Sequence, residues 1–142
     1  MVDRDIVAGK VAIIRDAVER VREVLPPEAA LFVADRGTRE IVALNLLVAI
    51  QESIDLAAHW IADAGLAVPG TQRELFDRLA DHGIVSRDLA SRLSAACGMR
   101  NVIAHQYGTV DWVRVHGAAT SDLSDLEALC ESAARQALGD EA

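Results

Sequence analysis

An arginine, an asparagine, a histidine and a tyrosine stand within eight residues of one another in the stretch GMRNVIAHQYG, residues 98–108. Arginine is a permanent cation whose planar fork matches phosphate oxygens, and histidine is the side chain whose proton is mobile near neutral pH. Metal-independent cleavage of an RNA phosphodiester needs a base for the ribose 2′-OH, an acid for the leaving 5′-oxygen and a cation for the phosphorane. Arg100 and His105 are therefore candidate catalytic residues for this chemistry.

Helical spacing decides which of these side chains can meet. At about 100° per residue, Asn101 and His105 lie on one face, while Arg100 and Tyr107 are nearly aligned about two turns apart. Arg100 and His105 diverge by about 140° on the same helix, although a long arginine side chain can swing round toward a shared ligand. Two interpretations stay open: a reactive site, or a structural set in which Asn101 bonds to His105, Arg100 pairs with one of the 22 acidic residues and Tyr107 caps the edge of the core.

The stretch offers one histidine per chain, and one imidazole cannot easily serve as acid and base at once. A homodimer that places two copies across a two-fold axis supplies two imidazoles and two guanidiniums to one cleft. The formal net charge of -8 opposes general affinity for nucleic acid. A nucleic-acid role therefore needs a local positive cleft of this kind.

The elements that carry the stretch are expected to be helices. Hydrophobic residues make up 51% of the 142 residues but aromatic residues only 4%, which favours an all-α protein with a single domain over residues 1–142. The apolar run 41–50 is shorter than the ~20 residues that span a bilayer, and the acidic start MVDRDIV is unlike a signal peptide. We expect a cytoplasmic protein without a membrane segment, in which Cys97 and Cys130 are reduced and buried.

Apolar periodicity and capping signals predict an up-and-down bundle of about five helices. The first helix is expected from Asp3 to Pro26, followed by a short piece over 28–33 and a long helix that follows 35–38 and ends at Gly65. A short helix should run from a capping box at Thr71 to Gly83, and the next helix from Ser86 to Gly108. The last helix should start at Ser121 or Ser124. Residues 109–119 are expected to form a connection with one helical turn. Gly65, Gly70 and Gly83 are spaced as helix stops rather than as a phosphate loop, and no cofactor is expected.

Other polar and aromatic residues have weaker claims to a function. Asp55 and His59 lie four apart, so they can share one face and, in principle, one metal. Nothing completes a ligand set, so no metal site is expected. The pair either lines a cleft or consists of solvated or core-edge residues. Cys97 has no evident proton-transfer partner that would make it a nucleophile. His82 and His116 are expected at the surface, and Trp60 and Trp112 in the core or a dimer interface.

The segment from Leu44 to Trp112 resembles the HepT toxins, a branch of the HEPN superfamily. The resemblance rests on RNVIAHQY at 100–107, which matches the Arg-x4-His-x-Tyr signature, with SIDLAAH at 53–59 and FDRL at 76–79 upstream. A match to the short signature alone would arise often by chance. The surrounding helical order makes the resemblance specific.

The resemblance implies a HEPN-type bundle that dimerises through its motif-bearing helices and acts as a metal-independent endoribonuclease toxin of a type VII toxin–antitoxin system. Arg100 and His105 would be catalytic and leave a 2′,3′-cyclic phosphate on the RNA, and Asn101 would support them by orienting the imidazole or contacting RNA. Tyr107 would receive AMP from an MntA-type nucleotidyltransferase antitoxin, which would block the site. The alternative is a catalytically silent helical partner of a nucleotidyltransferase, whose motif serves only as a binding cleft.

Overall fold

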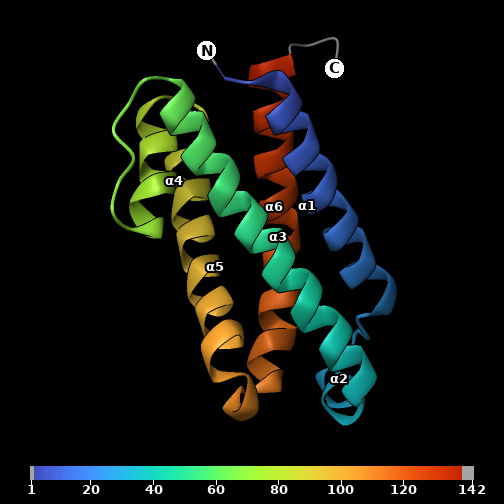
Figure 1. Ribbon diagram of the computed structural model, residues 1–142. Helices are drawn as coiled ribbons and strands as arrows, with labels where there is room; N and C mark the ends of the chain where they lie inside the picture. The colour runs from blue at the N-terminus through green and yellow to red at the C-terminus, as the bar shows by residue number, and fades with distance from the viewer. Residues whose placement is uncertain (1, 139–142) are drawn as a thin grey trace.

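The computed structural model describes residues 2–138 and consists there of helices without strands, as predicted (Figure 1). Four long helices make the bundle, and two short helices and one 3-10 turn lie between them. The elements are α1 (Arg4–Val24), α2 (Ala29–Ala34), α3 (Arg36–Asp63), α4 (Gln72–Asp81), α5 (Arg87–Gln106), η1 (Tyr107–Thr109) and α6 (Trp112–Leu138).

The four long helices run antiparallel in an up-and-down order. In Figure 1, α1 and α5 descend while α3 and α6 ascend, so the two ends of the chain lie at the same end of the bundle. The short helix α4 packs against α5 near that end, and α2 packs against α3 and α6 at the opposite end. The C-terminal end of α5 therefore lies at the α2 end of the bundle, far from the chain termini.

Apolar side chains from all six α-helices form one continuous core. Steps of four and three between apolar residues predict a buried seam from Val7 to Leu25. Its members Val7, Val11, Ile14, Val18 and Val21 are all buried, whereas Leu25, the C-cap residue of α1, is half-buried. The helix α3 is long and apolar enough to cross a membrane by length and composition. Because α3 packs against α1, α4, α5 and α6, the core of the bundle accounts for that composition.

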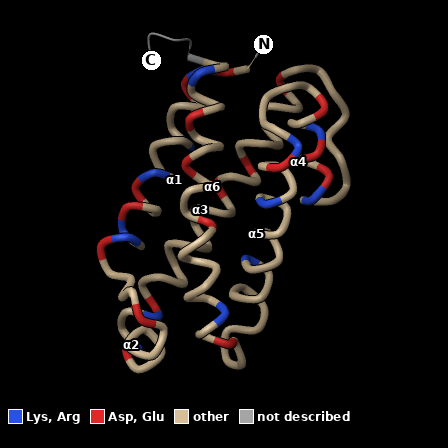
Figure 2. Tube along the Cα trace, turned by 180° about the vertical axis from the view of Figure 1, so that it is seen from behind, with Lys and Arg blue, Asp and Glu red and all other residues tan. Residues whose placement is uncertain are grey.

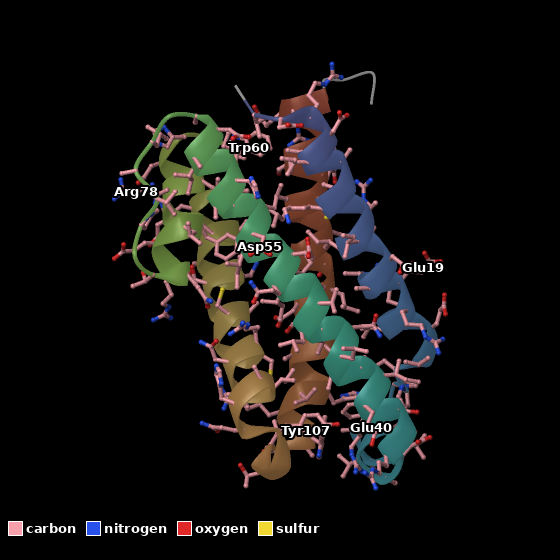
Figure 3. The ribbon with its side chains drawn as sticks, viewed as in Figure 1. Glu19, Glu40, Asp55, Trp60, Arg78 and Tyr107 are labelled. Carbon is pink, nitrogen blue, oxygen red and sulfur yellow. The ribbon has the colours of Figure 1, made fainter. Side chains whose placement is uncertain are left out.

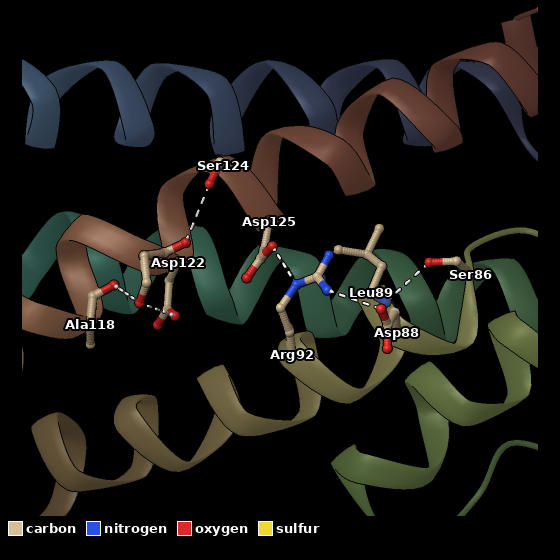
Figure 4. A network of polar contacts seen from close by, with 9 residues as sticks. Ser86, Asp88, Leu89, Arg92, Ala118, Asp122, Ser124 and Asp125 are labelled. Carbon is tan, nitrogen blue, oxygen red and sulfur yellow. Dashed lines mark hydrogen bonds and ion pairs between the residues drawn. The ribbon is translucent and has the colours of Figure 1, made fainter.

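The helix α5 begins where the sequence predicts. The hydroxyl Oγ of Ser86 accepts a hydrogen bond from the backbone N–H of Leu89 at 3.1 Å (Figure 4). One turn further on, Arg92 donates from Nε to the carboxylate of Asp125 on α6 at 2.9 Å. The cap stabilises the first turn of α5, and the ion pair ties the following turn to α6.

Replacing Ser86 by alanine should lower the free energy of unfolding by about 1 kcal/mol, because it leaves an N-terminal amide of α5 without its acceptor. The melting temperature should fall by roughly 2–4 °C for a chain of this size. Ser91→Ala is the matched control, since Ser91 is exposed within the same helix. Equal melting temperatures for the two variants in calorimetry would contradict the capping role.

Two helix boundaries near the motif differ from the predictions. The helix α5 ends at Gln106 rather than at Gly108, because Gln106 leaves helical geometry at φ -130 and ψ 27 and a 3-10 turn follows. The last helix starts at Trp112, not at Ser121 or Ser124. Asp111 supplies its cap by accepting from the backbone N–H of Val113 at 3.0 Å.

The expected connection over 109–119 is therefore mostly helix. Gly117 favours a break there, since glycine is unfavourable in a helix interior. Val115 and Ala119, on either side of it, are fully buried in the core. Tertiary packing of that face outweighs the local preference of one glycine.

Candidate functional site

A cleft of about 680 Å³ runs from the start of α4 along α5. Three of the four predicted site residues, Arg100, Asn101 and His105, line it, and Tyr107 does not. The full lining is Thr71, Gln72, Arg73, Ser94, Ala95, Cys97, Gly98, Arg100, Asn101 and His105. Gly98 lies inside the continuous helix α5.

The cleft carries positive charge in a strongly acidic protein. None of its lining residues is acidic, and the chain contains no Asp or Glu between Asp88 and Asp111. A second depression of similar size, about 630 Å³, lies between α1 and α6 and mixes arginines with glutamates. Figure 2 shows the contrast, because blue and red segments alternate along α1 whereas blue segments recur along α5. A cleft lined by one sign of charge attracts counter-ions of the opposite sign.

The guanidinium of Arg100 is fixed by two neutral amides. Its Nη2 donates to Oε1 of Gln51 on α3 at 2.6 Å, and its Nη1 donates to Oδ1 of Asn101 at 2.9 Å. Gln51 in turn donates from Nε2 to the carboxylate of Asp55 at 3.1 Å, so Asp55 orients the amide. Within residues 2–138, Arg100 forms no ion pair with a carboxylate, and its Nε is buried without a partner. The cation is therefore held in place but not neutralised.

The imidazole of His105 is exposed in the last turn of α5, at the margin of the cleft. Oδ1 of Asn101 accepts from Arg100, and no hydrogen bond joins Asn101 to His105 in the described part of the chain. The two bonds of the structural interpretation are wrong, because within residues 2–138 Asn101 does not bond to His105 and Arg100 does not pair with an acidic residue. Its placement of Tyr107 at the edge of the core agrees with the contact between Tyr107 and Trp112. The ring of His105 is left accessible to a molecule in the cleft.

Tyr107 lies beyond the end of α5 and turns toward α6. Its ring meets the edge of Trp112 at a centroid distance of 5.4 Å, and 44% of the residue remains exposed (Figure 3). Trp112 also packs against Phe32 of α2 and lies under the guanidinium of Arg39. The alignment of Arg100 with Tyr107 on one straight helix is therefore wrong, because the helix ends between them.

The remaining candidates divide between surface and core. His59 and His82 are exposed, while Asp55 is bound by Gln51, and neither Asp55 nor His59 lines the cleft. No group of three potential metal-ligating side chains occurs in the region that the structure describes. His116 was expected at the surface but is half-buried, since its Nε2 forms a hydrogen bond with the carbonyl oxygen of Pro26 at 2.7 Å. That bond closes the loop after α1 onto α6.

Both cysteines are buried thiols, as expected. Burial raises the pKa of Cys97 to about 11, although the nearby Arg100 and Arg73 favour the thiolate. Burial likewise raises the pKa of Cys130 to about 11. Neither thiol is activated as a nucleophile near neutral pH.

Sequence reasoning missed Gln51 and Arg73. Gln51 stands 49 residues before Arg100 and carries no motif of its own. Arg73 lies inside the capping box of α4, where the pattern points only to a helix start. Only the packing of α3 and α4 against α5 brings these two side chains to the motif.

Comparison with known proteins gives a consistent result. Residues 14–133 match the sequence model of the family described as ribonuclease HepT-like. A protein of Shewanella oneidensis named mRNA nuclease HepT is 28% identical over 123 residues, which are 87% of this chain and 92% of that protein.

Solved structures agree in fold over nearly the whole chain. The tri-AMPylated Shewanella oneidensis HEPN toxin, in complex with an MNT antitoxin, superposes with a TM-score of 0.82 at 26% identity, covering 90% of this chain and 96% of that one. A toxin–antitoxin crystal structure with AMP-PNP gives a TM-score of 0.81 at 26% identity, covering 91% of this chain and 98% of that one.

Proposed function

Because the chain belongs to the ribonuclease HepT-like family, we propose that it is a cytoplasmic endoribonuclease and the toxin of a type VII toxin–antitoxin pair. The observation that carries the proposal is the fixed but unneutralised guanidinium of Arg100 in a carboxylate-free cleft that also holds His105. Such a site suits an RNA phosphate. The relatives named as an mRNA nuclease and as a HEPN toxin support it.

In the proposed reaction the ribose 2′-oxygen attacks the adjacent phosphorus and the bond from phosphorus to the 5′-oxygen breaks. One imidazole removes the proton of the 2′-OH, and a second gives a proton to the leaving 5′-oxygen. Arg100 stabilises the charge on the phosphorane, and Asn101 supports it by holding Nη1. The products are a 2′,3′-cyclic phosphate and a free 5′-OH, and no metal takes part.

Two imidazoles require two chains. We propose a homodimer in which the α5 helices of two copies face each other across a two-fold axis, so that one cleft holds both pairs of Arg100 and His105. The exposed position of His105 at the cleft margin is compatible with such pairing. A single chain would leave one histidine per site.

We propose an MntA-type nucleotidyltransferase as the antitoxin and Tyr107 as its target. The phenol oxygen of Tyr107 would attack the α-phosphate of ATP, form a phosphodiester with AMP and release pyrophosphate. The residue is 44% exposed and its ring is steadied by Trp112, so the hydroxyl can be reached without unfolding. A bulky anionic adduct two residues after His105 would obstruct RNA at the cleft. The similar Shewanella oneidensis HEPN toxin, which is tri-AMPylated and in complex with an MNT antitoxin, supports a partner of this type and the AMPylation of the toxin.

The proposed function is tested by incubating the purified protein with RNA in the presence of EDTA. Cleavage that proceeds with EDTA and leaves 2′,3′-cyclic phosphate ends is the expected result. Metal-dependent cleavage, or 3′-hydroxyl ends, would overturn the mechanism. Absence of both cleavage and growth arrest would favour the silent binding partner.

Replacing Gln51 by glutamate should lower kcat/KM, mainly through a higher KM. The carboxylate would form an ion pair with Arg100 that the RNA phosphate has to displace, which costs roughly tenfold, the size of one charge-assisted hydrogen bond of about 1.5 kcal/mol. Glu52→Gln is the control, because Glu52 on the same helix pairs with Lys10 of α1 and lies outside the cleft. If steady-state kinetics gave the wild-type KM for Gln51→Glu, the neutral charge of Gln51 would not matter for the binding of RNA by Arg100.

A further inference from the structure

The cleft holds a second arginine that the proposed reaction does not use. Arg73, in the first turn of α4, lines the cleft together with Arg100 of α5. Cys97 lies within the electrostatic reach of both guanidiniums, since each of them favours its thiolate. The two cations therefore converge on one stretch of the cleft from two different helices.

The backbone of Arg73 is fixed while its side chain is free. Ser94 of α5 donates from its buried hydroxyl to the carbonyl oxygen of Arg73 at 3.3 Å, which ties the start of α4 to α5. The guanidinium of Arg73 is exposed and makes no hydrogen bond or ion pair within residues 2–138. In contrast, Arg87 and Arg92 of α5 pair with Asp81 and Asp125.

On the basis of the proposed ribonuclease function, we propose that Arg73 binds a second phosphate of the RNA strand, adjacent to the scissile phosphate at Arg100. Successive phosphates along a single strand give a polyanion, and each arginine can neutralise one of them. The cleft, at about 680 Å³, lies within the range of about 300–1,000 Å³ that is typical of ligand sites and exceeds the needs of a single phosphate.

An RNA strand fits the arrangement better than the adenylate of a modified Tyr107. Tyr107 lies past His105 at the α2 end of the bundle and does not line the cleft (Figure 3). Arg73, in the first turn of α4, lines the end of the cleft that is farther from His105. Because Ser94 of α5 bonds to the backbone of Arg73, the order along α5 is Arg73, then Arg100, then His105. A strand that places its scissile phosphate at Arg100 thus continues toward α4 and reaches Arg73.

The test uses the His105→Ala variant, which should bind RNA without cleaving it at an appreciable rate. Its affinity for a single-stranded oligoribonucleotide is measured as a function of salt concentration, and the oligoribonucleotide contains a cleavage site mapped with the wild type. Adding Arg73→Gln should reduce the slope of log K against log salt by about 0.7, the value for one single-strand phosphate contact. If the two proteins bind equally at 1 M salt, this difference in slope makes the protein with Arg73→Gln bind about fivefold more weakly than its parent at 0.1 M salt. Arg78→Gln is the matched control, because Arg78 is an exposed arginine on the same helix and faces a different pocket (Figure 3).

A neutral methylphosphonate placed at successive positions of the oligoribonucleotide locates the contact. At one position next to the cleavage site it should weaken binding to the protein with Arg73 but not to the Arg73→Gln variant. Equal slopes for Arg73→Gln and Arg78→Gln would overturn the inference and leave the ribonuclease proposal intact. A change of Arg73→Gln to a monomer in size-exclusion mass measurement would also overturn it, since the arginine would then serve subunit pairing. Absence of RNA binding and cleavage by the wild type would refute both.

Discussion

Replacing His105 by alanine is expected to lower kcat for RNA cleavage by about 10²–10⁴-fold, the contribution of a positioned acid or base. The side chain is exposed and makes no hydrogen bond within residues 2–138, so its removal breaks no contact of the fold. The melting temperature should therefore stay at the wild-type value while activity is lost. Single-turnover cleavage of labelled RNA, combined with calorimetry, measures the two effects separately.

A second histidine serves as the control for this result. His59 is exposed on α3 and does not line the cleft, so His59→Ala should keep full activity. Growth arrest on expression should likewise be lost with His105→Ala and retained with His59→Ala. If the wild type and His105→Ala cleaved RNA at the same rate, His105 could not be the acid or the base.

Replacing Arg100 by lysine should reduce kcat by about 10²–10³-fold, the usual effect of removing one group that stabilises the charge of a transition state. Lysine keeps the positive charge but lacks the planar fork. An ammonium bonded to both Gln51 and Asn101 would have one N–H left, so it could not present paired donors to a phosphate. The ammonium would lose its fixed position at the cleft. The expected loss is thus a loss of geometry rather than of charge.

Stability measurements on the same variant separate catalysis from folding. Arg100 is half-buried, so its replacement also removes two hydrogen bonds and is expected to cost about 1–2 kcal/mol of stability. Arg114→Lys is the control at an exposed arginine of α6 outside the cleft. Near-wild-type kcat in a folded Arg100→Lys variant would show that a point charge suffices. It would contradict the proposal that Gln51 and Asn101 hold the guanidinium in a position that catalysis requires.

The helical frame of this protein could be predicted because its signals are local. Apolar spacing marked the buried face of α1, and Asp3, Thr71 and Ser86 marked helix starts at the observed positions. Each of these signals depends on residues within one or two helical turns, which is the range over which caps and amphipathic faces act. The start of α6 was missed because Gly117 weakens the local pattern while packing at Val115 and Ala119 keeps the chain helical.

The order of residues along the chain was enough to place Arg100, Asn101 and His105 on one helix of a HepT-like helical bundle. The surroundings of those side chains depend on how the helices pack. Two amides hold Arg100, Arg73 joins the same cleft, and Tyr107 turns away to Trp112. The physical reason is range: a helix fixes the spacing of its own residues, whereas partners as distant in sequence as Gln51 and Arg73 reach the motif only when whole helices come together.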